Sequence, residues 1–260
     1  MDATDLDLPQ PVKKPKISTK TPMASPHGNY NHYYLGRHAS GDDQDPRLQL
    51  LQKDWFNGRK CLDIGCNDGS FTTQIANTFK VPYYLGIDID PRLIDRAWQS
   101  ADPQDNSVCC CWRREDFSTE DHVDLTGYDT VTAFSVVKWV HLNHGDSGVC
   151  NFFAKCFQLL RPGGILIIEP QDWASYRKNK GSSDTARLVF GSLKIRPSDF
   201  PAILVGPEVG FVSCEEVSAP QSLSKPDPGT SSSSPGLQAG FQRPLLVCTK
   251  GPLSPPGDVA

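Results

Sequence analysis

The sequence predicts an α/β fold with a mostly parallel sheet, and three observations support this class. Short apolar runs of strand length alternate with amphipathic stretches of helix length between residues 59 and 169, which is the pattern of strand, helix, strand units. A glycine-rich turn at 65–69 follows the first apolar run. Pro91 follows the second run, at a position that favours the start of a helix.

The expected elements follow one another along the chain. The first strand leads into a helix that presents Phe71, Ile75, Ala76 and Phe79 on one face. Pro91 opens a second helix, and a third helix covers 146–160, with an apolar face that includes Val149, Phe152, Phe153, Cys156 and Leu160. The predicted strands cover residues 59–64, 81–89, 108–112, 128–134, 165–169 and 244–248.

The composition predicts one folded unit with flexible ends. The chain has 260 residues and a formal net charge of −4, which argues against indiscriminate binding to nucleic acid. We expect one folded domain over 28–250, interrupted by a Ser/Pro-rich flexible insertion at 218–239, with disordered segments at 1–27 and 251–260. No apolar segment is long enough to span a membrane. The nine cysteines predict neither a disulfide framework nor a zinc site, and favour the cytosol or nucleus.

Polar residues after three successive strands predict a cofactor site. Asp63 and the turn Gly65-Cys66-Asn67-Asp68-Gly69 end the first strand, Asp88 ends the second, and Asp116-Phe117 follows the third. Ligands of such sheets bind at the carboxyl ends of the strands, where an acidic residue accepts ribose hydroxyls. The turn lacks both the Gly-x-Gly-x-x-Gly pattern and the P-loop pattern. S-adenosylmethionine fits this arrangement, with Asp63 suited to its cationic amino acid portion.

Several motifs resemble those of the methylphosphate capping enzyme family. They are Gly28-Asn29-Tyr30-Asn31-His32-Tyr33-Tyr34, Leu62-Asp63-Ile64-Gly65-Cys66-Asn67, Gly86-Ile87-Asp88-Ile89-Asp90, the block from Ser135 through Lys138-Trp139-Val140-His141-Leu142-Asn143 to Asp146, Arg161-Pro162-Gly163-Gly164, Glu169-Pro170-Gln171 and Gly240-Phe241-Gln242-Arg243-Pro244. The resemblance implies a Rossmann-like class I S-adenosylmethionine-dependent methyltransferase fold with a seven-stranded sheet. It also implies methylation of the 5′-terminal phosphate of a small noncoding RNA. The nuclear branch that caps the γ-phosphate of 7SK snRNA is the most similar, and a sister branch methylates 5′-monophosphate ends.

The resemblance also implies roles for individual residues. The cofactor set is Tyr34, Arg47, Gly65, Cys66, Asn67, Asp88, Ile89, Asp116, Phe117 and Phe134, and the phosphate-facing set is Tyr33, Arg37, Lys138 and Arg196. No metal is expected. The chain departs from the family where Asp116-Phe117 replaces Asn-Tyr and where Gln171-Asp172-Trp173 replaces Gln-Pro-Trp. The second change puts a carboxylate near the acceptor side.

Other features admit a structural and a functional interpretation. We interpret the run Cys109-Cys110-Cys111 as small core residues and not as a metal cluster. Neighbouring strand residues point to opposite faces, so the three thiols cannot easily bind one ion. We expect His141 and His144 to orient a loop through hydrogen bonds rather than to act in acid–base catalysis. We expect Trp139 to lie in the core. Trp173 is interpreted either as a core residue or as a ring that stacks on a base of the RNA. The basic residues between Arg177 and Arg196 suit guidance of an RNA end. Lys13 to Lys20 suit nuclear import.

Three functions remain open on the sequence. The first is an RNA 5′-phosphate methyltransferase acting on a triphosphate or a monophosphate end, expected to be a monomer in the nucleus, with the cytoplasm as the alternative. The second is an RNA-binding subunit that retains its product within a ribonucleoprotein, with protein partners. The third is a methyltransferase for small molecules, which leaves the basic residues between Arg177 and Arg196 without a purpose.

Overall fold

The computed structural model describes residues 27–28, 44–100, 109–122, 127–218 and 243–252. The predicted flexible segments at the two ends and the insertion lie almost entirely outside these residues. So do Tyr33, Tyr34, Arg37 and the basic segment from Lys13 to Lys20.

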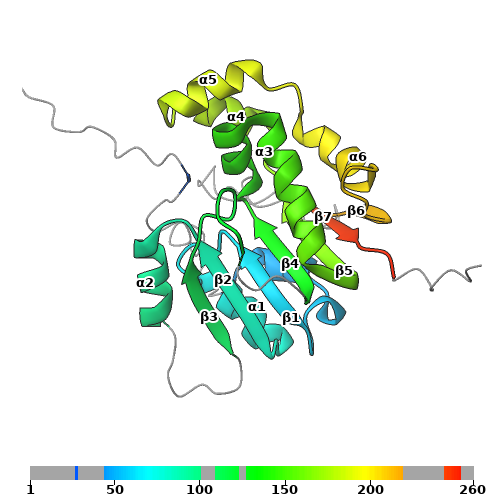
Figure 1. Cartoon of the computed structure of the whole chain (residues 1–260). Coiled ribbons are helices and arrows are strands. Elements are labelled where there is room, and N and C mark those ends of the chain that lie inside the picture. Colours follow the sequence, from blue (N-terminus) through cyan, green and yellow to red (C-terminus); the bar gives the residue numbers. More distant parts are fainter. Residues whose placement is uncertain (1–26, 29–43, 101–108, 123–126, 219–242, 253–260) are drawn as a thin grey trace, which may run out of the picture.

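The described strands form one sheet in the order β3-β2-β1-β4-β5-β7-β6 (Figure 1). β7 runs antiparallel to both of its neighbours, and the other paired strands are parallel. This confirms the mostly parallel seven-stranded sheet. The strands are β1 (Lys60–Ile64), β2 (Tyr83–Asp88), β3 (Cys110–Arg114), β4 (Tyr128–Phe134), β5 (Leu160–Glu169), β6 (Ser213–Val217) and β7 (Leu245–Thr249).

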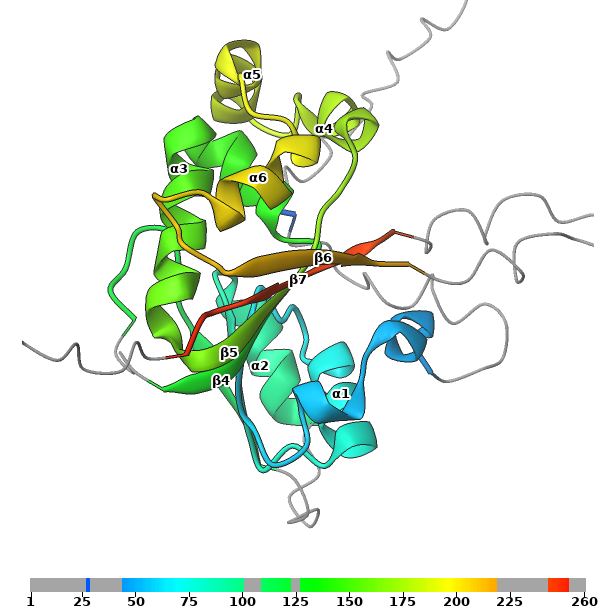
Figure 2. The ribbon, with the colours of Figure 1, turned by 90° about the vertical axis from the view of Figure 1, so that its right-hand side faces the viewer.

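Helices cover both faces of the sheet, as predicted. Figure 2 shows α3 and α6 on one side and α1 on the other. The described helices are α1 (Ser70–Phe79), α2 (Pro91–Ser100), α3 (Val137–Leu159), α4 (Trp173–Asn179), α5 (Asp184–Ser192) and α6 (Phe200–Val205), with 3-10 turns η1 (Pro46–Leu50), η2 (Lys53–Trp55) and η3 (Pro197–Asp199). None of the helices in the described part of the chain is long and apolar enough to cross a membrane.

Two apolar cores lie between the sheet and these helices. Phe152, Phe153 and Cys156 of α3 are buried against one face of the sheet. Phe71 and Ile75 of α1 are buried against the other face. The periodicity of the apolar residues therefore predicted the buried face of both helices correctly.

The third helix begins nine residues earlier than predicted. α3 starts at Val137 directly after β4, and a kink at Gly145 (φ 71°, ψ −168°) separates its first turns from the segment predicted to be helical. Residues other than glycine rarely adopt this backbone conformation, because their Cβ atom makes a positive φ unfavourable. The block from Lys138 to His144 is therefore helical, so Lys138 is held by a helix and not by a loop. The sequence analysis did not predict β6, α4, α5 or α6.

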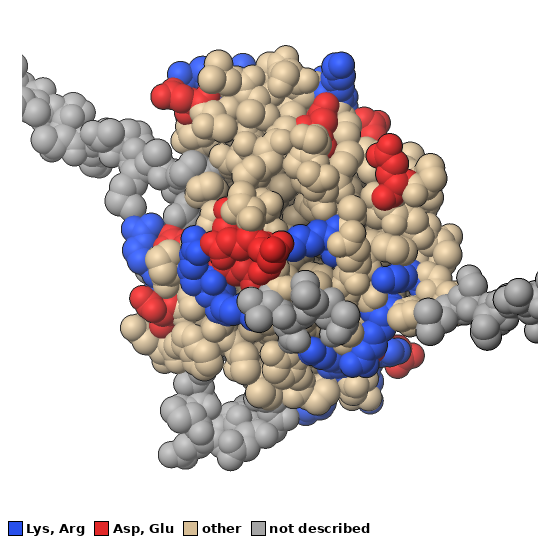
Figure 3. Space-filling view, viewed as in Figure 1, with Lys and Arg blue, Asp and Glu red and all other residues tan. Residues whose placement is uncertain are grey.

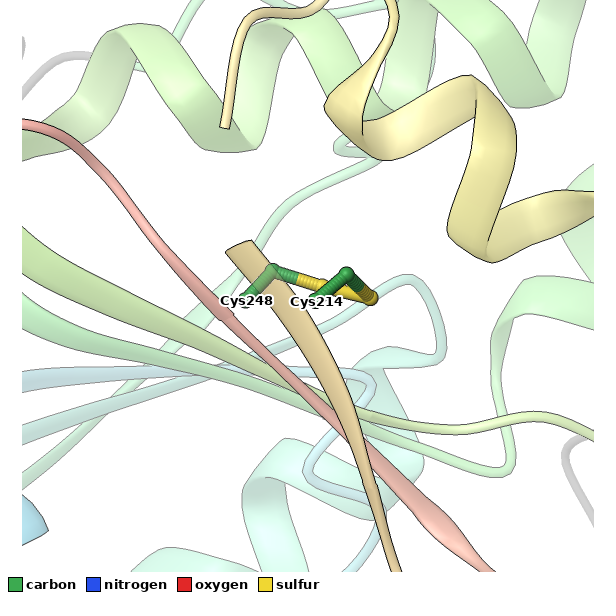
Figure 4. The surroundings of a disulfide bond; sticks show 2 residues. All are labelled: Cys214 and Cys248. Atoms are coloured by element: carbon green, nitrogen blue, oxygen red, sulfur yellow. A yellow bond between two sulfur atoms is a disulfide. The ribbon is translucent and has the colours of Figure 1, made fainter. Parts of the chain in front are cut away.

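The cysteines differ from the prediction in two places. Cys214 of β6 and Cys248 of β7 lie opposite each other in the antiparallel register and form a disulfide (Figure 4). The sequence analysis did not predict this bond, because it depends on the pairing of two strands whose cysteines are 34 positions apart. Cys109 is exposed and Cys110 is half-buried, so the prediction that all three adjacent cysteines belong to the core is wrong. Within the described residues, no group of three or more His, Cys, Asp or Glu is placed to hold a metal ion.

Candidate functional site: a pocket at the carboxyl ends of the strands

A pocket lies at the carboxyl ends of the first four strands. The strand order places β1 and β4 side by side although β2 and β3 come between them in the chain. Such a reversal opens a crevice at the sheet edge. Seven of the predicted cofactor residues line the pocket: Gly65, Asn67, Asp88, Ile89, Asp116, Phe117 and Phe134.

The turn between β1 and α1 forms the floor of the pocket and requires glycine at its start. Gly65 has φ +76°, and a Cβ atom there would lie 2.7 Å from Cγ2 of Val136. The next residues bring the chain back toward β2, because the Asn67 amide donates a hydrogen bond to Asp88 Oδ2 at 3.0 Å. The turn therefore exposes backbone to a ligand at the point where a side chain does not fit.

Asp88 supplies a buried carboxylate to the pocket wall. Its side chain also accepts a hydrogen bond from the Asp90 amide at 2.9 Å, and the residue is 8% exposed. Burial raises the pKa of Asp88 to about 6, although the two backbone donors partly oppose this rise. The carboxylate has acceptor capacity beyond these two bonds, as a ribose diol requires.

The loop after β3 forms the opposite wall. Phe117 is buried and packs edge-to-face on Phe152 with ring centroids 5.3 Å apart. Asp116 orders the loop by accepting hydrogen bonds from the Ser118 amide at 3.0 Å and the Thr119 hydroxyl at 2.6 Å. Lys155 of α3 donates to the Phe117 carbonyl at 2.7 Å. This loop offers an aromatic surface and a carboxylate at a fixed place, as predicted for an adenine.

Asp63 and Cys66 are not among the residues that line the pocket, so a contact of either with the cofactor stays a prediction. Ile64 lines it instead, and Asp63 faces the other side of the sheet because successive strand residues alternate. There Asp63 accepts hydrogen bonds from the hydroxyls of Thr72 and Thr132, and burial raises its pKa. The thiol of Cys66 packs into an apolar cluster with Trp112.

Arg47 is also absent from the pocket wall, and its side chain binds other residues of the protein. Its guanidinium forms ion pairs with Asp45 at 2.8 Å and Glu169 at 3.1 Å, and it lies 3.8 Å from the centroid of the Phe71 ring. These contacts connect the segment before β1 to the end of β5. A direct contact between Arg47 and the cofactor stays a prediction.

Two cationic side chains, Lys138 and Arg243, lie beside the pocket and are called the cationic pair here. Lys138 is 5% exposed, and its ammonium donates to Ser175 Oγ at 2.9 Å. Arg243 donates to the hydroxyl of Ser135, a pocket residue, at 3.2 Å and lies 3.8 Å from Glu169. Burial lowers the pKa of Lys138 to about 8, and repulsion by Arg243 contributes to this effect. The arrangement of two like charges in a partly buried place suits an anionic ligand.

Arg196 lies in a different environment from Lys138. Its guanidinium stacks on the Trp173 ring at 3.8 Å and donates to the Leu193 carbonyl at 3.0 Å. Trp173 in turn stacks with Tyr176 and Phe190, with ring centroids 5.1 and 5.0 Å apart. The predicted phosphate contact of Arg196 stays a prediction, as do those of Tyr33 and Arg37.

His141 has the orienting role that the sequence favoured. Its buried ring lies 3.2 Å from the Tyr176 hydroxyl and 2.9 Å from Asp146 Oδ1. Burial lowers its pKa, although Asp146 opposes this shift. The Asp146 carboxylate also accepts the amides of Lys194 and Ile195. His141 thus connects α3, α4 and the segment before Arg196. His144 lines the cofactor pocket, and Trp139 is buried as expected.

Arg243, Ser135 and Gln171 were not predicted from the sequence as site residues. Arg243 belongs to a quoted motif, but only the fold brings this residue, just before β7, within hydrogen-bond distance of Ser135, just after β4. Ser135 has φ 59°, which turns the chain out of β4. Gln171 donates from Nε2 to the Ser135 carbonyl, and its buried Oε1 has no hydrogen-bond partner among the described residues. The motif around Arg243 was the available signal.

The pocket fits S-adenosylmethionine. The Gly65 turn presents backbone at a point where a Cβ atom would collide with Val136, the Asp88 carboxylate is placed for a ribose diol, and Phe117 with Asp116 is placed for an adenine. When bound, this cofactor supplies a methyl group on a sulfonium. The acidic lining of Asp88, Glu115 and Asp116 also suits a cationic ligand.

Comparisons with known proteins agree with this geometry. A family model described as Methyltransferase domain matches residues 62–166, and one described as Bicoid-interacting protein 3 (Bin3) matches residues 128–250. The N-methyltransferase NodS from Bradyrhizobium japonicum has a similar fold, with a TM-score of 0.53 and 17% identity, over 82% of this chain and 99% of that chain.

Curated relatives cover most of the chain. A probable RNA methyltransferase from Arabidopsis thaliana is 34% identical over 86% of this chain and 80% of its own length. The U6 snRNA methylphosphate capping enzyme Amus from Drosophila melanogaster is 35% identical over 86% of this chain and 74% of its own length. The 7SK snRNA methylphosphate capping enzyme from Mus musculus is 32% identical over 86% of this chain, which spans 40% of that protein. This chain therefore belongs to the Bicoid-interacting protein 3 (Bin3) family, together with the methylphosphate capping enzymes that its motifs resemble.

Proposed function

We propose that this protein transfers a methyl group from S-adenosylmethionine to the terminal phosphate at the 5′ end of an RNA. The observation that carries the proposal is the position of the cationic pair beside the cofactor pocket. Ser135 lines that pocket and accepts a hydrogen bond from Arg243. A site for a methyl donor and a site for an anion therefore meet at the ends of β4 and β5.

The reaction requires positioning more than proton transfer. A phosphate oxygen is ionised near neutral pH and can attack the methyl group without a general base, so orientation of the reactants dominates. The Lys138 ammonium and the Arg243 guanidinium hold the charged oxygens that do not react. With a pKa of about 8, Lys138 is mostly protonated at pH 7. The hydrogen bond to Ser175 fixes the direction of its ammonium.

An RNA acceptor is supported by the surface next to this site. Arg177, Lys178 and Lys180 on and beside α4, Arg187 of α5 and Lys194 are all exposed. Figure 3 shows acidic and basic side chains interspersed over the face seen in Figure 1. This favours local guidance of an RNA end over dense binding of a long nucleic acid.

Within this proposal, the acceptor is the γ-phosphate of a small noncoding RNA that resembles 7SK snRNA. Two of the relatives are named for capping U6 and 7SK snRNA. Action in the nucleus, with other ribonucleoprotein components, is part of the same proposal and follows from the basic segment Lys13 to Lys20 and from the family motifs.

The proposal is tested with one RNA prepared with a 5′-triphosphate, a 5′-monophosphate or a 5′-hydroxyl end. The purified chain is incubated with each RNA and S-adenosylmethionine that carries a labelled methyl group. We expect label on the terminal phosphate of the triphosphate RNA, resistant to alkaline phosphatase and released by a pyrophosphatase that cleaves the triphosphate, and none on the hydroxyl RNA. Label on a base or on the ribose contradicts the proposal, and label on the monophosphate RNA alone contradicts the choice of the γ-phosphate. Multiple turnovers distinguish an enzyme from a subunit that retains its product.

A further inference from the structure

An acidic side chain lies beside the cationic pair. Asp172 precedes α4, is exposed, and accepts a hydrogen bond at Oδ1 from the Ser175 amide at 2.7 Å. The hydroxyl of the same serine accepts the hydrogen bond from the Lys138 ammonium at 2.9 Å. One residue thus connects the carboxylate to the ammonium, so both charges lie at the same end of α4.

The charges that face Lys138 act in opposite directions. Burial, Arg243 and Lys178 lower the pKa of Lys138, whereas Asp172 raises it. The Asp172 carboxylate therefore acts on the ammonium that we assign to the acceptor phosphate. It lowers the positive potential of the site.

The local fold at this position does not require a negative charge. Asp172 caps α4 by accepting the Ser175 amide, and asparagine caps a helix about as well as aspartate. The charge is thus a feature of this chain that its helix cap leaves unexplained.

We propose that Asp172 determines how strongly the acceptor site responds to the charge of the RNA end, by weakening the attraction for a 5′-triphosphate relative to a 5′-monophosphate. Every additional negative charge on the RNA end is repelled by the carboxylate as well as attracted by Lys138 and Arg243. Because Asp172 is exposed, water screens its charge, and one such charge several ångströms away changes the affinity for each added charge by about threefold. The inference rests on the proposed function and names a residue that sets its acceptor range.

Asp172→Asn tests this inference because asparagine keeps the helix cap and removes the charge. We expect the KM for triphosphate RNA to fall by about threefold or more relative to the KM for monophosphate RNA of the same sequence. We also expect the alkaline limb of the pH profile, where Lys138 loses its proton, to move to lower pH. A role limited to capping α4 moves neither quantity. Asp95→Asn is the matched control, because Asp95 is an exposed residue of α2 and its removal changes the net charge by the same amount.

Equal changes in KM for both RNA ends overturn the inference, as does an Asp172→Asn variant whose KM ratio and pH profile equal those of the Asp95→Asn control. Equilibrium binding separates this result from failure of the proposed function. Fluorescence anisotropy with S-adenosylhomocysteine present gives the affinity for the triphosphate, monophosphate and hydroxyl RNAs without methyl transfer. If the wild type transfers no methyl group but Asp172→Asn still shifts the triphosphate-to-monophosphate ratio of Kd values, the proposed function fails and the inference about Asp172 holds.

Discussion

Affinity for the cofactor is expected to decrease when the pH falls through the pKa of Asp88. This pKa is raised to about 6 by burial, and the ionised carboxylate is the form assigned to the ribose hydroxyls. The ionised fraction falls from about 0.9 at pH 7 to about 0.1 at pH 5, so the Kd should rise about tenfold over this range. An aspartate with the ordinary pKa of about 3.9 stays more than about 0.9 ionised at pH 5 and changes the Kd very little.

Isothermal titration calorimetry with S-adenosylhomocysteine measures this dependence without methyl transfer. Asp88→Asn removes the titrating carboxylate and is expected to bind about tenfold more weakly at pH 7, with little further change at pH 5. His27 also lines the pocket, and burial lowers its pKa, so the variant shows which group is responsible. A change of less than twofold in the wild type refutes the reasoning, and so does an Asp88→Asn variant that keeps the wild-type pH dependence.

Three further outcomes are expected. Activity on RNA should fall about tenfold per pH unit above pH 8, because Lys138 loses its proton as the pH rises through its pKa of about 8. The Lys138→Ala variant should lack this decrease in activity at high pH and should have a lower kcat, while its Kd for S-adenosylhomocysteine stays within twofold of the wild type. Gly65→Ala should abolish cofactor binding in calorimetry, because its Cβ would lie 2.7 Å from Val136 and the backbone has φ +76°; a wild-type Kd contradicts this. Reduction of the bond between Cys214 and Cys248, or Cys214→Ser, should lower the free energy of unfolding by about 4 kcal/mol, from the loop entropy for a separation of 34 residues; urea denaturation with and without reductant measures it, and equal midpoints contradict it.

Part of the site could be predicted because it follows local rules. The carboxyl ends of parallel strands meet at one edge of the sheet, so Asp88 after β2 and Phe117 after β3 were expected to face one ligand, and both line the pocket. Asp63 was expected to face the same ligand but is not among the residues that line the pocket. The residue that enters the pocket at the end of β1 is set by strand alternation, and here it is Ile64.

Other features depend on contacts between segments far apart in the chain. Arg243 and Ser135 are 108 positions apart and meet because β7 inserts antiparallel beside β5. Cys214 and Cys248 meet because β6 pairs with β7 in a particular register. In neither pair does the sequence around one residue indicate which residue it contacts.

The sequence by itself determined the α/β class, the apolar faces of α1 and α3, and the glycine turn and carboxylates of the cofactor pocket, because periodicity and turn chemistry act over a few residues. Only the tertiary structure decided that Lys138 and Arg243 lie together beside that pocket, that Asp172 and Lys138 both contact Ser175, and that Asp63 points away from the pocket. The physical reason is that strand order, register and side-chain direction follow from packing of the whole sheet against its helices.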